Sequence, residues 1–485
     1  MTRLLVGPFN RVEGDLEVTL DIEGGQVTSA RINAPMYRGF EQILQGKHPH
    51  DALVYVPRIC GICSVSQSVA CARALASLGG IEPPPNGQHV TNVMLATENL
   101  ADHLTHFYLF FMPDFTRPVY AHQPWHAEAV RRFAPQTGEQ TRAAIAARQR
   151  WFTLLGTLAG KWPHTQSIEA GGSTRPVEAA ERIRLLAKVR EFRSFLEREL
   201  FAAPLELVAG LNSEKALWDW HAQEPWRGDF RLFLSMVQSA GLASLGPGPG
   251  RYLSYGAYPQ PGGGFEFGSG VWLADTAALT PLDAGAIRED ATHAWLADAA
   301  GPRHPVEGIT QPDIDKADAY TWNKAPRLAG QVVETGAIAR QLAASHPLVL
   351  DAVGRHGATV FTRVLARVLE LARVVPMMEE WLRQLQPNAP YCVPSPDFAE
   401  GVGVGLSEAA RGSLGHWVVA SRGRIANYQI VAPTTWNFSP RDSAGTPGAL
   451  EQALVGARVE PGETTPVSVQ HIVRSFDPCM VCTVH

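Results

Sequence analysis

Two pairs of cysteines are the residues most able to do chemistry in this chain of 485 residues. Cys60 and Cys63 form one C-x-x-C pair, and Cys479 and Cys482 form a second pair close to the last residue. Two intervening residues let both sulfurs of a pair turn toward one ion, and four thiolates favour zinc, copper(I), iron–sulfur or nickel-type centres over hard, oxygen-loving ions. The cysteines therefore predict one redox-active metal centre that both ends of the chain share.

A zinc ribbon or two separate redox dithiols would also contain such pairs. The pairs of a zinc ribbon usually stand about 15–20 residues apart, whereas nearly the whole chain lies between Cys63 and Cys479. Spacing alone leaves these alternatives open. A shared site would require the end of the chain to fold into its interior, as large enzymes can arrange.

The residues that flank the cysteines narrow the choice. Segment 58–63 reads Arg-Ile-Cys-Gly-Ile-Cys, and segment 477–485 reads Asp-Pro-Cys-Met-Val-Cys-Thr-Val-His. They resemble the R-x-C-G-x-C and D-P-C-x-x-C-x-x-H motifs of the nickel–iron hydrogenase large subunit. Further agreements follow in the order of that family and extend the resemblance from residue 11 to the last residue: 11–14, 38–41, 106–108, 408–412 and 433–437.

The resemblance implies that the four thiolates hold nickel. Cys63 and Cys482 would bridge to an iron that carries carbon monoxide and cyanide ligands, and Cys60 and Cys479 would bind nickel alone. Dihydrogen would be split heterolytically by base-assisted chemistry, with the metals as Lewis acid and Cys479 as the proton acceptor. Glu13 matches the proton-relay glutamate of the family, although an ordinary surface carboxylate is the alternative for this residue.

Further polar residues match the family's surroundings of the metals. By position, Arg411, Asp114 and Asp477 form a polar canopy, and a guanidinium such as that of Arg411 could donate to an iron cyanide. Asp477 can also be interpreted as a turn residue before the following proline. Thr434, which follows Pro433, occupies the position of a small residue that contacts the other cyanide.

Glu41, His485 and a backbone carbonyl near Ile430 resemble the ligands of a nearby magnesium ion, with waters completing its coordination. A carboxylate and a carbonyl suit a hard cation. Histidine is a less usual ligand for magnesium, so the identity of this metal rests on the resemblance. Cys71 and Cys392 lie outside the motifs, and we expect both to be structural.

Three departures from the family pattern bear on function. Gln67, four residues after Cys63, replaces the histidine that normally ends the first motif, so a neutral amide stands where an imidazole could titrate. The sequence stops at His485, whereas catalytic members are made with an extension that is removed after this histidine. Ile62 and Phe110 stand where valine and leucine are common, and their added bulk would narrow a gas path and hinder oxygen.

Gln67 and the missing extension together are the pattern of the regulatory, hydrogen-sensing branch of the family. The resemblance thus predicts an oxygen-tolerant hydrogenase of low activity that signals dihydrogen to a histidine kinase controlling hydrogenase genes. A catalytic uptake hydrogenase in processed form is one alternative, and a non-enzymatic sensory or scaffold protein that kept the fold is another. The cysteine pairs argue against the quinone-module subunit of respiratory complex I.

Composition restricts the possible partners and the compartment. The net charge of −5 includes no basic excess for nucleic acid, and no stretch of about 18 uncharged apolar residues predicts a membrane span. Six cysteines and no export signal indicate a reducing cytoplasm. No further cysteine cluster could hold an iron–sulfur centre. Electrons would therefore leave through a separate iron–sulfur small subunit, in a heterodimer or a dimer of heterodimers. The low charged fraction of 18% fits a surface that is covered by this subunit.

Mainly helical elements with peripheral strands must position these residues. The pattern predicts a β-hairpin over 16–33, strands over 416–431, a loop or irregular strands over the Gly/Pro-rich segment 246–270, and an extended tail over 468–485. It predicts helices over 64–78, 86–111, 141–158, 177–201, 283–298 and 353–385.

The chain contains no clean domain linker. We expect a single large-subunit domain over 1–485, with an N-terminal β-hairpin region (1–35) and a helical body (36–485) that ends in a small C-terminal β region. The resemblance implies a central helical bundle with the C-terminus buried at the metal site.

Overall fold

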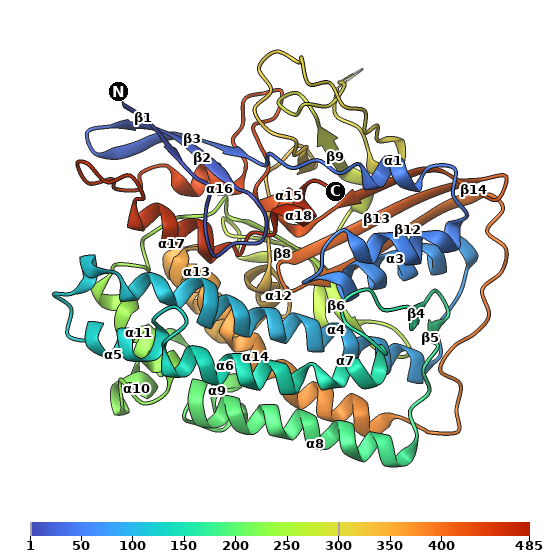
Figure 1. The fold of residues 1–485 in the computed structure, drawn as a ribbon, viewed down its shortest axis with the longest axis horizontal. Helices are drawn as coiled ribbons and strands as arrows, with labels where there is room; N and C mark the ends of the chain where they lie inside the picture. Colours follow the sequence, from blue (N-terminus) through green and yellow to red (C-terminus); the bar gives the residue numbers. More distant parts are fainter. Residues whose placement is uncertain (1, 299–300) are drawn as a thin grey trace.

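The computed structural model describes residues 2–298 and 301–485. Long helices form the lower half of the molecule in Figure 1, sheets and short helices form the upper half, and the C-terminus lies near the centre. The expected fold, mainly helical with peripheral strands and a buried C-terminus, is confirmed. The division of the chain into an N-terminal β-hairpin region (1–35) and a helical body (36–485) stays a prediction.

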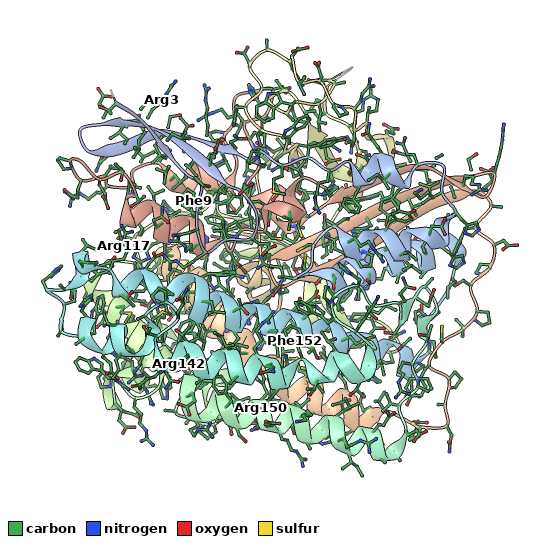
Figure 2. All side chains as sticks on the ribbon, viewed as in Figure 1. Arg3, Phe9, Arg117, Arg142, Arg150 and Phe152 are labelled. Carbon is green, nitrogen blue, oxygen red and sulfur yellow. The ribbon has the colours of Figure 1, made fainter. Side chains whose placement is uncertain are left out.

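Four long helices pack side by side in the helical layer. They are α4 (Pro85–Thr105), α6 (Glu139–Trp151), α8 (Ala179–Phe195) and α14 (Val360–Gln384). Their facing surfaces bury apolar side chains such as Trp151 and Phe192, whose rings stack at 4.2 Å between centroids. On the outer side Arg150, labelled in Figure 2, pairs with Glu191 at 2.8 Å. The layer is thus held by its apolar interior, because exposed ion pairs contribute little.

The sheet that matters for the site consists of β12 (Gly401–Ala409), β13 (Gly412–Ser421) and β14 (Arg424–Val431), all antiparallel. Helix α3 (Ser64–Gly79) lies directly on it. A Cβ atom on Gly403 or Gly405 would stand 2.1 Å from the carbonyl of Ala74 or 2.0 Å from that of Ala70. Two glycines on one face of β12 therefore bring α3, and the cysteine loop before it, close to the sheet.

Several predicted elements are confirmed with altered ends. The hairpin is β2 (Glu17–Glu23) with β3 (Gln26–Asn33), extended by an unpredicted β1 (Thr2–Val6). The helix predicted over 86–111 is α4 followed by a π-helical segment, His106–Phe111, and Pro113 lies in the 3-10 turn Met112–Thr116 beyond it.

The helix predicted over 353–385 begins later, at Val360. Gly357 has a φ of 69° and ends α13 (Pro347–His356). The side chain of Thr359 then accepts the N–H of Thr362 and caps α14. A glycine in the left-handed region followed by an N-cap threonine separates two helices that share one apolar pattern.

The prediction of a loop or irregular strands over 246–270 is wrong for most of that segment, because β6 (Arg251–Pro259) and β7 (Phe265–Leu273) are long paired strands. They belong to a four-stranded sheet with β11 (Glu334–Thr335) and β8 (Ala278–Thr280). This sheet was not expected in the helical body.

Two further predictions, for segment 283–298 and for the tail from 468, are wrong. Segment 283–298 is not a helix. Asp283 and Asp290 accept backbone N–H groups two residues ahead and form turns, and β9 (Ile287–Asp290) pairs with β10 (Ala325–Leu328). The tail from 468 is not extended, because α17 (Val467–Ser475) buries Val469, Ile472 and Val473 at helical spacing.

The remaining elements are short and connect these layers. They are α1 (Phe40–Leu44), α2 (Ala52–Tyr55), α5 (His126–Phe133), α7 (Thr153–Leu158), α9 (Leu205–Ala209), α10 (Glu214–Gln223), α11 (Asp229–Ser239), α12 (Ala337–Ala343), α15 (Pro433–Asn437), α16 (Ala449–Leu454), α18 (Met480–Thr483), β4 (Ile168–Glu169) and β5 (Gly172–Ser173). Among the helices described, none has the length and apolar character needed to cross a bilayer.

Candidate metal centre

The four motif cysteines meet at one point in the interior. Their sulfurs all lie within 4.8 Å of one another, and all four residues are buried. Cys60 Sγ is 3.4 Å from Cys479 Sγ, and Cys63 Sγ is 2.8 Å from Cys482 Sγ. None of the four is in a disulfide. Four buried thiol groups that converge without cross-linking fit a soft metal centre.

Each cysteine pair lies at the start of a helix. Cys63 directly precedes α3, and Cys479 directly precedes α18. The guanidinium of Arg38 donates to the carbonyl of Ile59 in the first loop and to that of Val481 in the second. One half-buried cation thereby joins the two cysteine loops, which come from opposite ends of the chain.

Glu13 is attached to the second cysteine loop through its backbone. The N–H of Met480 donates to the carbonyl of Glu13 at 2.7 Å, and Glu13 forms an isolated parallel bridge with Cys479. Gly14 has a φ of 78°, and a Cβ there would stand 3.1 Å from Val481. This glycine lets the glutamate segment approach the metal loop closely.

The side chain of Glu13 lies in an environment that favours its protonated form. Burial raises its pKa, the nearby Cys60 raises it further, and Arg411 opposes both effects. Arg411 is itself buried between two carboxylates, at 3.0 Å from Asp102 and 3.2 Å from Asp477. A half-buried carboxyl group next to thiols and a fixed guanidinium is well placed to exchange protons.

Asp477 is the canopy carboxylate that the structure ties most firmly to Arg411. Burial acts to raise the pKa of Asp477, but Arg411, His106 and Arg367 together bring it below the ordinary value. Arg367 donates to its second oxygen at 3.3 Å. Asp477 therefore holds two arginines beside the cysteines as a stable anion.

Asp114 lies in a neighbouring network. It pairs with Arg11 and, at 2.5 Å, with Arg474. Arg474 also donates to the carbonyl of Asn10 at 2.8 Å. In the structure Asp114 thus holds the chain segment that precedes Glu13, and its ion pairs do not include the canopy arginine.

Thr434 contacts the second cysteine loop. Its hydroxyl oxygen accepts the N–H of Cys479 at 3.2 Å, and the neighbouring Thr435 donates to the carbonyl of Thr483 at 3.0 Å. Pro433 begins α15, which carries both threonines. This short helix therefore supports the second cysteine loop through two hydrogen bonds.

Glu41 and His485 come together as the resemblance implied. Their Oε1 and Nε2 atoms are 3.1 Å apart, and the same oxygen accepts the N–H of Ile430 at 2.8 Å. Burial acts to raise the pKa of Glu41, but Lys324 and His485 lower it to about 2. The ammonium of Lys324 lies 3.3 Å from Glu41. The carboxylate and imidazole fit a cation by donor type, and the lysine balances the anion beside them.

Of the residues that depart from the family pattern, Gln67 contacts the metal centre directly. Gln67 Nε2 is 3.9 Å from Cys482 Sγ, while Gln67 Oε1 is 2.8 Å from His416 Nε2. Ile62 belongs to the first cysteine loop and is partly buried, as is Phe110 in the π-helical segment.

Several buried polar residues of the site were not predicted from the sequence: Glu98, Asp102, Arg367 and His416. A signal for two of them was present. Glu98 and Asp102 stand four residues apart in the mostly apolar helix α4, so they share one face. Carboxylates in such a helix are seldom buried unless they are paired, and this pair marks the face of α4 that points to the cysteines.

Glu98 offers a test of how the first loop is held. Its carboxylate accepts the N–H groups of Val65 (2.9 Å) and Ser66 (2.8 Å) at the start of α3. It also accepts the indole N–H of Trp162 at 2.9 Å. A Glu98→Gln variant turns an amide NH₂ toward some of these donors. Each unsatisfied buried donor costs about 1–3 kcal/mol, so the free energy of unfolding should fall by about 2 kcal/mol or more. Denaturant titration measures this loss, and the exposed Glu82→Gln substitution is the control; equal midpoints would contradict the capping role.

A centre of four buried thiol groups, flanked by a half-buried carboxyl and a fixed arginine, is the arrangement of a redox metalloenzyme rather than of a zinc ribbon. A family model described as nickel-dependent hydrogenase matches residues 38–141 and 231–485. The chain belongs to the nickel-dependent hydrogenase family, in which it corresponds to the large subunit.

Similar proteins of known identity cover the chain completely. It is 28% identical to the periplasmic NiFeSe hydrogenase large subunit of Desulfomicrobium baculatum, over 100% of this chain and 95% of that protein. It is 27% identical to the uptake hydrogenase large subunit of Rhodobacter capsulatus, with the same coverage. The solved structure of the reduced, active Ni-Fe-Se hydrogenase from Desulfomicrobium baculatum matches with a TM-score of 0.87 and 26% identity, over 100% of both chains.

Proposed function

We propose that the chain splits dihydrogen at a nickel–iron centre with carbon monoxide and cyanide on its iron, and that this reaction serves to sense dihydrogen. When bound, the centre would supply Lewis-acid and redox chemistry. Cys60 and Cys479 are the proposed terminal ligands, and Cys63 and Cys482 are the proposed bridging ligands. The sulfurs of the proposed bridging pair lie 2.8 Å apart.

The protein's own residues would move the protons. One dihydrogen molecule yields two protons and two electrons. Cys479 is the proposed first proton acceptor, and Glu13, bound to the same loop, is the proposed relay to solvent. Arg411 would orient iron-bound cyanide from its fixed position between two carboxylates. The electrons would leave through the clusters of an iron–sulfur small subunit.

We assign magnesium to the position between Glu41 and His485, with the carbonyl of Ile430 and waters as further ligands. The donor types support this assignment. The ion would join the last residue of the chain to α1 and β14, and it would thereby keep the second cysteine loop in place.

The sensing role rests on Gln67. A neutral amide lies against Cys482 where the family's catalytic members have an imidazole. We further propose that a histidine kinase in the cytoplasm receives the signal. A reporter gene placed behind a hydrogenase promoter tests the proposal. Expression that responds to dihydrogen should be lost when the gene for this chain is deleted and restored by the wild-type gene, but not by a Cys482→Ser copy.

A catalytic uptake hydrogenase is the second candidate, supported by the printed name of the Rhodobacter capsulatus relative. In that case the deletion would remove hydrogen-dependent respiration and leave the reporter's response intact. Cell fractionation followed by co-purification with a kinase would examine the compartment and the partner separately.

Ile62 and Phe110 provide a prediction about oxygen. If their bulk narrows the gas path, an Ile62→Val, Phe110→Leu double variant should lose most of its hydrogen-dependent dye reduction in air, while the wild type keeps its activity. Dihydrogen is smaller than oxygen, so activity without oxygen should change little. The matched control is Ile183→Val with Phe265→Leu, because both side chains are exposed, at 66% and 39%. Unchanged oxygen tolerance of the test variant would contradict the narrow-path explanation.

A further inference from the structure

A line of buried polar groups leads away from the sulfur of Cys482. Gln67 Nε2 faces this sulfur at 3.9 Å, and Gln67 Oε1 meets His416 Nε2 at 2.8 Å. His416 Nδ1 meets the hydroxyl of Tyr428, also at 2.8 Å. The three side chains come from α3, β13 and β14, and their residues are at most 1% exposed. The interface between helix and sheet therefore connects the metal centre to two residues outside every motif.

The orientation of the Gln67 amide decides what the sulfur meets. An amide has one end that donates and one end that only accepts. With the observed orientation, an N–H points at the sulfur. The reverse orientation would place the carbonyl oxygen against a thiolate and leave two electron-rich atoms in contact in a buried site, where such a contact is costly.

His416 selects the observed orientation. Its Nε2 lies against the amide oxygen, which can only accept, so Nε2 must carry the hydrogen. The reverse orientation would bring the amide NH₂ against that N–H. The hydroxyl of Tyr428, 2.8 Å from Nδ1, supports this tautomer, because it can donate to Nδ1 when Nε2 carries the hydrogen. Burial also lowers the pKa of His416 to about 3, in keeping with a neutral ring.

His416 differs from other buried histidines near the centre. The Nδ1 atoms of His103 and His106 have no hydrogen-bond partner in the described structure, whereas both ring nitrogens of His416 are bonded. His416 and Tyr428 also share one face of the sheet, since His416 pairs with Ile430 and Val418 pairs with Tyr428 across β13 and β14. The sheet register thus aligns the histidine and the tyrosine toward α3.

We propose that His416, held by Tyr428, is a positioning residue that keeps the Gln67 N–H directed at the sulfur of Cys482. The inference rests on the proposed function in one respect: it takes Cys482 as a ligand of the nickel–iron centre. A hydrogen-bond donor fixed on a bridging thiolate withdraws electron density from the metals. His416 and Tyr428 would therefore set the electron density of the centre without contacting the metals.

Two substitutions of His416 separate this role from simple packing. The amide nitrogen of His416→Gln can take the place of Nε2 and still donate to Gln67. His416→Asn retains a polar group near Nδ1 and loses the donor. Infrared spectra of the purified holoenzyme report the electron density through the bands of iron-bound carbon monoxide and cyanide. Nickel and iron contents, measured on the same samples, establish equal loading.

We expect the carbon monoxide band of His416→Asn to move to lower wavenumber, because a thiolate without its donor pushes more density onto the iron. The band of His416→Gln should stay at the wild-type position. Equal bands in all three proteins at equal loading would overturn the inference, as would equal shifts in both variants. If His416→Asn binds less metal, the Tyr428→Phe variant takes its place. We expect its carbon monoxide band to shift in the same direction by a smaller amount, and an unchanged band would count against the inference. A wild-type spectrum without these bands would instead refute the proposed function.

Discussion

Replacing Cys482 by serine is expected to abolish both stable nickel binding and hydrogen-dependent dye reduction. The sulfur of Cys482 lies 2.8 Å from that of Cys63 and 3.2 Å from that of Cys479, so it contacts both cysteine pairs of the cluster. A serine hydroxyl is a hard donor that stays protonated at neutral pH, whereas the site selects soft metals through thiolate. Loss of a second-shell partner of a metal costs about 10–100-fold, so loss of a ligand should lower activity by more than about 100-fold.

Metal analysis of the purified complex tests this expectation, with dye reduction measured on the same samples. The matched control is Cys392→Ser, because Cys392 is a free, partly buried cysteine remote from the motifs. That variant should bind metal and react like the wild type. A Cys482→Ser protein with a full complement of nickel would show that three cysteines suffice and would contradict the four-thiolate assignment.

The cysteine motifs carried most of what the sequence could say about the site. Their flanking residues predicted that residues 60–63 and 479–482 meet, and the structure brings them together. Two other segments that resemble the family, 11–14 and 38–41, predicted Glu13 beside the second cysteine loop and Glu41 beside His485, and the structure places both residues there. These predictions succeeded because each depends on a short segment whose residues act together.

Residues that act through the tertiary structure could not be predicted in this way. His416 meets Gln67 only because Gly403 and Gly405 admit α3 to the sheet. Arg367 reaches Asp477 from α14, a helix whose apolar pattern gives no hint of a buried cation. Hydrophobic periodicity indicates which face of a helix or strand is buried. It does not indicate which polar group of another element contacts that face.

Local polar competition explains the elements that were predicted wrongly. The alanine-rich segment 283–298 has a helical composition, but Asp283 and Asp290 bind nearby backbone N–H groups and favour turns. In the tail, Pro478 excludes helix only near itself, and the chain upstream of it forms α17. Composition therefore misled where one or two side chains decide the backbone conformation.

Glu13→Gln is expected to keep the metal centre and lose most of the activity. The carboxylate is not a ligand in the proposed centre, and the backbone of residue 13, which pairs with the Cys479 loop, is unchanged by the substitution. An amide cannot accept and release a proton, and general acid–base groups contribute about 10²–10⁴-fold to rates. Metal content should therefore equal that of the wild type, while dye reduction falls by about that factor.

The choice of control makes this result specific to the relay. Asp15 is an exposed carboxylate two residues further along the chain. Asp15→Asn therefore removes a carboxyl group from the same region. It should leave activity within about twofold of the wild type, as surface changes away from a site usually do. Glu13→Asp should retain part of the activity, because the shorter side chain still carries a titrating carboxyl. If Glu13→Gln reacted as fast as Asp15→Asn at equal metal content, protons would have to leave the cysteines by another route. Asp102, a buried carboxyl group that pairs with Arg411 and whose pKa is raised by burial, would then be the first residue to test.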